Sequence, residues 1–209
     1  MNCALYPDQY ANHFKTLSAQ NPELAVGDFC PDYAFWRENE IFDLLMSVAN
    51  SFEIRGIYLL RDPIERLYSW SKHKINRLTK DCHVSADDDF HHSIQNLDSY
   101  EYRSSQYEEI LPKLKRVFAR LRTETNINHE IKFMFNDHMF TQDGLNKLSE
   151  HIKCRNAKGN FSKKINEDPD HTKLPDIALK QAQPLFHLTY KYTLAEMGYL
   201  PKNWHFKQP

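Results

Sequence analysis

The stretch RDPIERLYSWSKH, residues 61–73, decides the fold of this chain, and it follows the apolar run IYLL at 57–60. A short aliphatic run of this kind is typical of a buried strand, and Asp-Pro-Ile-Glu after it is typical of a helix start. Asp62 is expected to be the N-cap, with Pro63 at the first helical position and Glu65 placed to return a capping-box bond. The sequence therefore predicts a strand, a tight turn and a helix.

The predicted turn has the chemistry of a phosphate site. A helix start offers backbone N–H groups and the positive end of the helix dipole to an anion. Arg61 comes directly before the helix and adds a guanidinium that can hold a phosphate through two hydrogen bonds. Ser69 and His73 are four residues apart, so they share one face of the helix.

Composition and charge narrow the class of protein. A chain of 209 residues with 41% hydrophobic residues can build one ordinary core, so we expect a single domain over residues 1–209. A net charge of −1 argues against a general nucleic-acid binder. Residues 61–80 hold six Lys/Arg against two acids, residues 147–164 hold six against one, and residues 81–109 hold eight acids against one Arg. Two basic segments could therefore meet around one small polyanion.

The cysteines and the apolar runs indicate the compartment. Four cysteines are scattered without a C-x-x-C pair, which disfavours a zinc site or a disulfide scaffold: Cys3, Cys30, Cys82 and Cys154. Residues 1–20 lack the pattern of a signal peptide, and no apolar run approaches the roughly 20 residues that span a bilayer. We therefore expect a soluble, cytoplasmic protein without a membrane segment.

The remaining pattern is a βα alternation typical of a parallel sheet. Strands are expected at 24–29, 55–61 and 131–137, with helices around 41–49, 110–121, 145–152 and 176–197, the last one closed by Gly198. Asp28 falls at the end of the first strand, where ligands gather in parallel sheets. A lone Asp in that position is nevertheless more often a cap or a salt-bridge partner.

Two polar segments remain outside this pattern. Residues 81–104 are expected to be an acidic surface excursion, and their Asp87–Asp89 and His91-His92 groups lack the spacing of a metal site. Residues 154–164 are basic and short of periodicity. They are either a solvated linker or a loop that closes over a phosphorylated ligand.

The Arg61–His73 block resembles the 3′-phosphate-binding motif of sulfotransferases that use 3′-phosphoadenosine 5′-phosphosulfate (PAPS). Its Tyr-Ser-Trp and His portion is most similar to the heparan sulfate N-sulfotransferase type. Residues 27–33, 105–107 and 197–204 resemble, in the same order, the family's Glu-x-Ser/Thr-Pro-x-Tyr segment, its Gly-x-Tyr segment and its C-terminal end. The resemblance implies an α/β, three-layer P-loop-like fold, with a central parallel sheet flanked by helices. It also implies PAPS as co-substrate and no metal.

The resemblance implies roles for individual residues. Arg61 and Ser69 would hold the 3′-phosphate, and His73 would transfer a proton or orient the acceptor at the reaction centre. Lys158 and Gly159 resemble the family's basic loop over the nucleotide phosphates. Asp28, a catalytic candidate, stands where the family usually has Glu.

One family element has no counterpart in this sequence. The strand, Lys-x-Gly-Thr-Thr loop and helix that bind the 5′-phosphosulfate should lie before residues 10–14, together with the family's usual Glu base. We therefore expect an N-terminally incomplete sulfotransferase, because losing those donors should remove most catalysis. The expected reaction is sulfuryl transfer from PAPS to a hydroxyl or amine of a carbohydrate or small molecule.

Two alternatives stay open at this point. The first is a catalytically silent domain that binds adenosine bisphosphate. The second, less favoured, is a P-loop kinase relative, for which the sequence shows no Walker motif.

Overall fold

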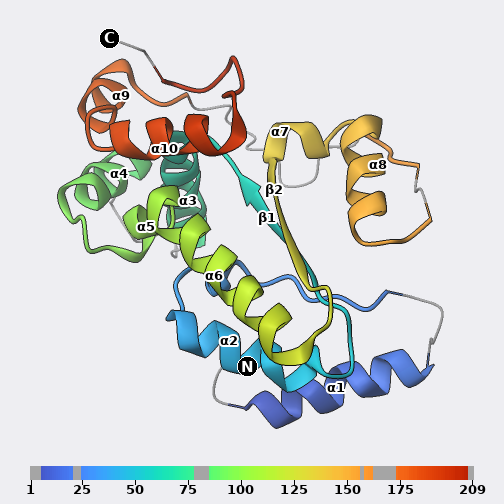
Figure 1. Ribbon diagram of the computed structural model, residues 1–209. Helices are drawn as coiled ribbons and strands as arrows, with labels where there is room; N and C mark the ends of the chain where they lie inside the picture. Colours follow the sequence, from blue (N-terminus) through green and yellow to red (C-terminus); the bar gives the residue numbers. More distant parts are fainter. Residues whose placement is uncertain (1–5, 21–24, 78–84, 156–157, 162–172, 207–209) are drawn as a thin grey trace. The chain divides into compact units, whose positions relative to one another are not determined.

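The computed structural model describes residues 6–20, 25–77, 85–155, 158–161 and 173–206 (Figure 1). The chain forms two compact units, the first made of residues 1–59 and 111–160 and the second of residues 60–110 and 161–209. Every helix in the described part is too short or too polar to cross a lipid bilayer. Cys30 and Cys154 are free thiols, whereas Cys3 and Cys82 lie outside the described residues.

The first unit surrounds a small sheet. Strands β1 (Arg55–Leu60, of which Leu60 belongs to the second unit) and β2 (Glu130–Phe135) pair in parallel. The helical elements of this unit are α1 (Pro7–Gln20), the short 3-10 helix η2 (Pro31–Ala34), α2 (Glu38–Ala49), α6 (Tyr107–Thr125) from residue 111 onward, α7 (Asn136–Met139) and α8 (Gln142–His151).

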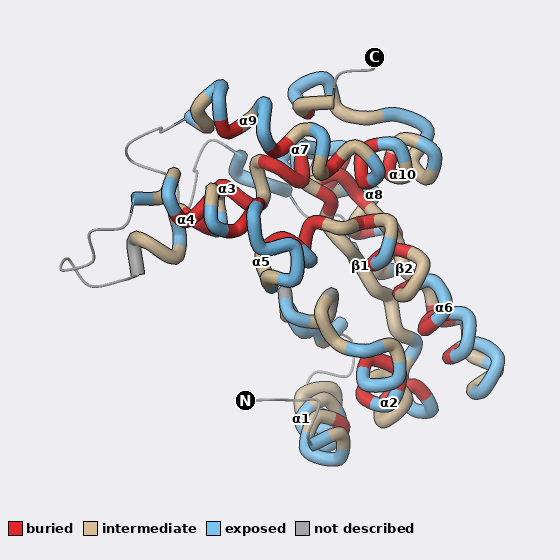
Figure 2. Tube along the Cα trace, turned by 90° about the vertical axis from the view of Figure 1, so that its left-hand side faces the viewer, coloured by how far each residue is buried: buried red, intermediate tan, exposed pale blue. Residues whose placement is uncertain are grey.

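Helices α2 and α6 supply most of the apolar core of this unit. Buried positions follow one side of α2 (Figure 2), in keeping with the periodicity of its sequence. The buried apolar side chains that the two helices contribute to this unit are Ile41, Phe42, Leu44, Val48, Ala49, Leu111, Leu114, Val117, Phe118 and Leu121. Gly56 of β1 lies very close to this core, since a Cβ added there would meet the ring of Phe118 at 2.6 Å.

We predict that Gly56→Ala destabilises the protein by about 1–3 kcal/mol, because a methyl group would overpack against Phe118 and Ile131. Gly27→Ala is the matched control, since a Cβ at Gly27 meets no atom within 4 Å. Urea unfolding of both variants measures the difference. Equal unfolding free energies would contradict the close approach of β1 to α6.

The second unit is helical. It contains α3 (Pro63–Arg77), α4 (Ala86–Gln95), α5 (Tyr100–Arg103), the first turn of α6, α9 (Asp176–Ala182) and α10 (His187–Met197). Helix α3 packs against α4, and the rings of Tyr68 and Phe90 meet edge to face at 5.6 Å. The other buried apolar side chains of this unit are Leu60, Ile64, Leu67, Ile94, Tyr102, Tyr107, Ile110, Ala178, Ala182, Phe186, Tyr190 and Trp204.

The strand, turn and helix around Arg61 are confirmed. Strand β1 ends at Leu60 and α3 begins at Pro63. Asp62 is the N-cap, and its Oδ1 accepts hydrogen bonds from the backbone N–H groups of Ile64 at 2.9 Å and Glu65 at 3.1 Å. The carboxylate of Glu65 bonds the side chain of His205 instead of returning a capping-box bond.

The α/β class is also confirmed, but the three-layer P-loop-like arrangement is wrong for the described residues. Their only sheet contains two strands, β1 and β2. A strand was expected at 24–29, but residues 25–29 are irregular, and Phe29 is 87% exposed. Gly27 and Asp28 are poor strand formers, and Asp28 accepts a hydrogen bond from the hydroxyl of Tyr33.

The acidic segment 81–104 is not a surface excursion where the structure describes it. Residues 86–95 form α4, because Ser85 caps the helix, with its Oγ accepting from the Asp88 N–H at 3.1 Å. Three aspartates in the first turn stabilise the helix, because their negative charges lie near the positive end of the helix dipole. The apolar side of this helix buries Phe90 and Ile94.

The last expected helix, 176–197, is interrupted. Helices α9 and α10 are separated by a turn at 183–186 that contains Pro184, which has no N–H to continue a helix. Gly198 closes α10 with a left-handed φ of 79°, as predicted. Two apolar side chains of these helices lie on the surface, since Ile177 of α9 is 69% and Leu188 of α10 is 62% exposed.

Candidate functional site

The backbone of Arg61 is held by a buried tyrosine. The hydroxyl of Tyr107 donates to the carbonyl of Arg61 at 2.7 Å and accepts from the Arg61 N–H at 3.2 Å. Burial raises the pKa of Tyr107, so this hydroxyl stays protonated and remains a donor, although the charge of Arg66 nearby acts in the opposite direction. Tyr107 belongs to the segment that resembles the family's Gly-x-Tyr, and in this structure its hydroxyl holds the backbone of Arg61.

Asp62 is the most densely hydrogen-bonded carboxylate in the described chain, and only 3% of its surface is exposed. Besides the two N–H groups of α3, it accepts from the hydroxyl of Tyr190 at 2.9 and 3.0 Å. The backbone N–H of His205 donates to Oδ2 at 2.6 Å. Burial raises the pKa of Asp62, while these donors act to lower it.

This geometry corrects the expected phosphate site. Pro63 has no N–H, and the N–H groups of Ile64 and Glu65 are already bonded to the carboxylate of Asp62. The Arg66 N–H bonds the Asp62 carbonyl at 2.8 Å. The first turn of α3 therefore carries its own anion, and its backbone N–H groups are not free to bind a phosphate.

We predict that Asp62→Asn lowers the unfolding free energy by about 1–3 kcal/mol at neutral pH, because an amide N–H₂ would face the donor N–H of His205. Asp98→Asn, at an exposed position of the same unit, is the matched control. Chemical denaturation over a range of pH measures both.

The pH dependence has a definite sign. Because the folded pKa of Asp62 is raised, the folded state holds this proton more tightly, and its contribution to stability falls as pH rises from about 4 through the folded pKa. The stability gap between the native protein and Asp62→Asn should therefore narrow as pH rises through that window. A gap that widens would contradict the assigned burial.

The three predicted site residues of the second unit lie in or next to α3. Arg61 and Ser69 are half-buried, and His73 is exposed on the same face as Ser69, one turn further along. The side chains of Arg61 and Ser69 form no hydrogen bond or ion pair with another described residue. Both are therefore available, within the described part, for a ligand.

The exposed end of this face carries an ordered aromatic group. The ring of Trp70 lies 6.2 Å from that of His73 and 5.5 Å from that of Tyr100. The Trp70 Nε1–H donates to the carboxylate of Glu101 at 3.2 Å, which fixes the orientation of the indole. The imidazole of His73 thus lies beside a fixed ring.

Part of the basic charge of α3 is neutralised by the acidic segment. Lys74 Nζ lies 2.7 Å from Asp89 Oδ1 and 3.9 Å from the carboxylate of Glu101. The hydrogen bond that Lys74 donates to Asp89 raises the pKa of Lys74. The hydroxyl of Tyr68 donates to Asp87 at 2.9 Å. Lys74 is thus paired with acidic side chains of α4 and α5. Within the described ranges, no group of three or more His, Cys, Asp or Glu side chains is placed to bind a metal ion.

The other predicted site residues belong to the first unit. Asp28 does not end a strand, and its carboxylate pairs with Tyr33, whose pKa is raised by burial and by this bond. Lys158 and Gly159 are exposed, and the Gly159 N–H donates to the side chain of Gln142 at 3.3 Å. Residues 156–157 and 162–164 of the basic segment around them lie outside the described residues. The hydrogen bond with Tyr33 favours a structural role for Asp28, as a paired surface carboxylate, over a catalytic one.

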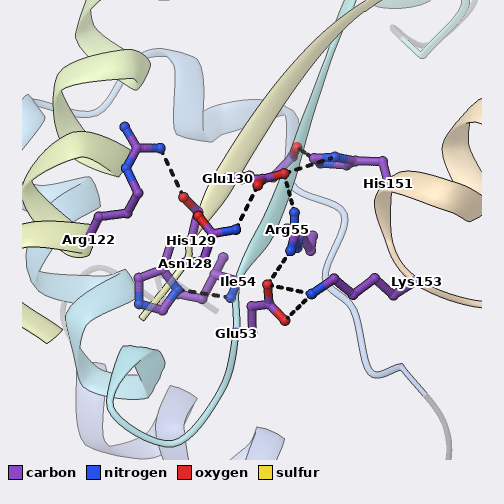
Figure 3. A network of polar contacts seen from close by, with 10 residues as sticks. Glu53, Ile54, Arg55, Arg122, Asn128, His129, Glu130, His151 and Lys153 are labelled. Carbon is purple, nitrogen blue, oxygen red and sulfur yellow. Dashed lines mark hydrogen bonds and ion pairs between the residues drawn. The ribbon is translucent and has the colours of Figure 1, made fainter. Parts of the chain in front are cut away.

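The first unit also contains a charged network that the sequence analysis missed (Figure 3). Arg55 bridges the carboxylates of Glu53 and Glu130, and Lys153 binds Glu53 at 2.8 Å. His151 is buried, with Nε2 2.9 Å from the carbonyl of Gly56. These groups come from residues far apart in sequence, so no local spacing reveals them.

The position of this network indicates a structural role. Glu53, Arg55 and Glu130 lie at or just before the amino ends of β1 and β2, whereas ligands of parallel sheets gather at the carboxyl ends. His129 is buried beside it, with Nδ1 accepting from the Ile54 N–H at 3.0 Å and Nε2 2.9 Å from the hydroxyl of Thr125. Burial lowers the pKa of His129, which keeps that imidazole neutral.

We predict that Glu130→Gln destabilises the protein at neutral pH. The folded pKa of Glu130 is lowered, first by the hydrogen bond from Asn128, so its stabilising contribution is present above about pH 4.5 and is lost as pH falls through the folded pKa. The difference in unfolding free energy between the native protein and Glu130→Gln, measured by chemical denaturation, should therefore disappear at acid pH. Glu124→Gln, at an i,i+4 surface pair with Arg120, should change stability less.

Comparison with known proteins identifies no relative. No protein-family model matches the chain, and no curated protein or solved structure matches it significantly.

Proposed function

We propose that this protein is a PAPS-dependent sulfotransferase whose 3′-phosphate site is built from Arg61 and Ser69. The observation that carries the proposal is the turn after β1, where Tyr107 fixes the backbone of Arg61 on both its N–H and its carbonyl side. The guanidinium extending from that fixed backbone has no ion pair with another described residue. It lies within a sequence motif that resembles the family's 3′-phosphate motif.

The chemistry of the two side chains suits a phosphate monoester. A guanidinium binds two phosphate oxygens at once, and a serine hydroxyl donates to a third. The proposal concerns a site and does not require the three-layer fold, because chemistry of one kind can occur on different scaffolds. It also agrees with the absence of free backbone donors at the start of α3, since it assigns the phosphate to side chains.

The proposed reaction is an in-line transfer. A hydroxyl or amine of a carbohydrate or small-molecule acceptor attacks the sulfur, and the bond between sulfur and the 5′-phosphate oxygen breaks. A general base takes the acceptor proton, and adenosine 3′,5′-bisphosphate leaves. His73 is exposed on the face of Ser69, so it is the candidate to take that proton or to orient the acceptor.

A catalytically silent nucleotide-binding domain is the second candidate. The observation that favours it is the two-stranded sheet of the described residues, in which no further strand carries a 5′-phosphosulfate loop. The sequence also contains no Lys-x-Gly-Thr-Thr segment. Such a domain would bind adenosine 3′,5′-bisphosphate without transferring sulfate.

We predict that Arg61→Ala weakens binding of adenosine 3′,5′-bisphosphate about 10- to 100-fold, the loss expected for a charge-assisted hydrogen bond. Ser69→Ala should weaken it about 3- to 10-fold, as for a neutral hydrogen bond. Isothermal titration calorimetry measures both. Arg103→Ala, which removes an exposed arginine of the same unit, should bind like the native chain.

A transfer assay separates the two candidates. The native chain is incubated with radiolabelled PAPS and a panel of amino-sugar oligosaccharides and small phenols. Labelled product that depends on Arg61 supports the sulfotransferase, and binding without product supports the silent domain. A native chain that does not bind the bisphosphate contradicts both.

A further inference from the structure

Two buried tyrosines from distant parts of the chain meet at the Arg61-Asp62 turn. Tyr107 begins α6 and bonds the backbone of Arg61, while Tyr190 lies in α10 and bonds the carboxylate of Asp62. Their exposed fractions are 0% and 1%. Each of the two residues that join β1 to α3 is thus hydrogen-bonded by one tyrosine hydroxyl.

Both hydroxyls are held as donors. Burial raises the pKa of Tyr107 and of Tyr190, and the charge of Asp62 raises that of Tyr190 further. The ring of Tyr190 packs against Trp204 at 6.1 Å and against Phe206 at 5.3 Å. The C-terminal segment therefore buries this tyrosine and also supplies the N–H of His205 to the same carboxylate.

Core packing alone does not explain why these two residues carry hydroxyl groups. A phenylalanine would fill nearly the same volume, and a buried tyrosine hydroxyl is tolerated only where it finds a partner. Here the partners are the backbone and N-cap of the turn that bears Arg61. A side chain that must meet a phosphate needs a backbone placed within about 0.5 Å, and removing either hydroxyl releases that restraint.

We infer that Tyr107 and Tyr190 are positioning residues for recognition of the 3′-phosphate, an inference that rests on the proposed nucleotide site. They act through Arg61, by holding its backbone and its neighbour Asp62. Neither hydroxyl is available to a ligand itself, because both are buried and already bonded. Their loss should therefore affect the 3′-phosphate and leave the rest of a nucleotide unaffected.

The test compares two nucleotides on the full chain. Calorimetry gives the dissociation constants of adenosine 3′,5′-bisphosphate and of 5′-AMP, which lacks the 3′-phosphate, for the native protein, Tyr107→Phe and Tyr190→Phe. We expect each variant to lose about tenfold in the ratio of the two affinities, while its affinity for 5′-AMP changes less than twofold.

Tyr102→Phe is the matched control. Tyr102 is also buried in the second unit, and its hydroxyl bonds a backbone carbonyl, that of Leu185 at 3.2 Å, away from the turn. It should lose stability comparable to that of the two variants, measured by thermal unfolding, and keep its selectivity. A purely structural role for the tyrosines predicts instead that all three variants behave alike.

The outcomes are distinct. A native protein that prefers the bisphosphate, with the same preference in both variants, overturns this inference and leaves the proposed function intact. A native protein without that preference overturns both. If Tyr107→Phe does not fold, Tyr190→Phe carries the same expectation, because its hydroxyl acts on the other residue of the turn.

Discussion

The buried carboxylate of Asp62 is the interaction on which the second unit depends. An isolated charge in an apolar interior is very costly, so this carboxylate is stable only when its donors are in place together. Those donors come from the start of α3, from Tyr190 of α10 and from the backbone of His205. One side chain therefore ties the strand-to-helix turn to the C-terminal part of the chain.

That arrangement shapes what the site can do. A helix start with free N–H groups could bind phosphate through its backbone alone, but here Asp62 occupies that position. The phosphate recognition that we propose for Arg61 and Ser69 therefore relies on side chains, and side chains are effective ligands only when their backbone is fixed. Tyr107 provides this restraint, since its single hydroxyl bonds both polar backbone groups of Arg61.

Local signals in the sequence correctly predicted the elements around Arg61, but they led to wrong predictions for two other segments. The strand, N-cap and helix around Arg61 were predictable because their determinants lie within a few residues of one another. The first strand failed because a short apolar run near Gly27 has no strong preference of its own. The segment 81–104 was misjudged because its acidic residues looked solvated, whereas Asp87 and Asp89 bond Tyr68 and Lys74 of α3.

The sequence by itself determined the α/β class, the turn between β1 and α3, and the residues Arg61, Ser69 and His73 as a candidate site. Only the tertiary structure decided that the helix start is occupied by Asp62, that two tyrosines hold the turn, and that Lys74 is committed to α4 and α5. The physical reason is the range of the interactions. Caps, turns and helical periodicity act over a few residues, whereas Tyr107, Tyr190 and His205 reach the turn from 46, 128 and 143 positions away.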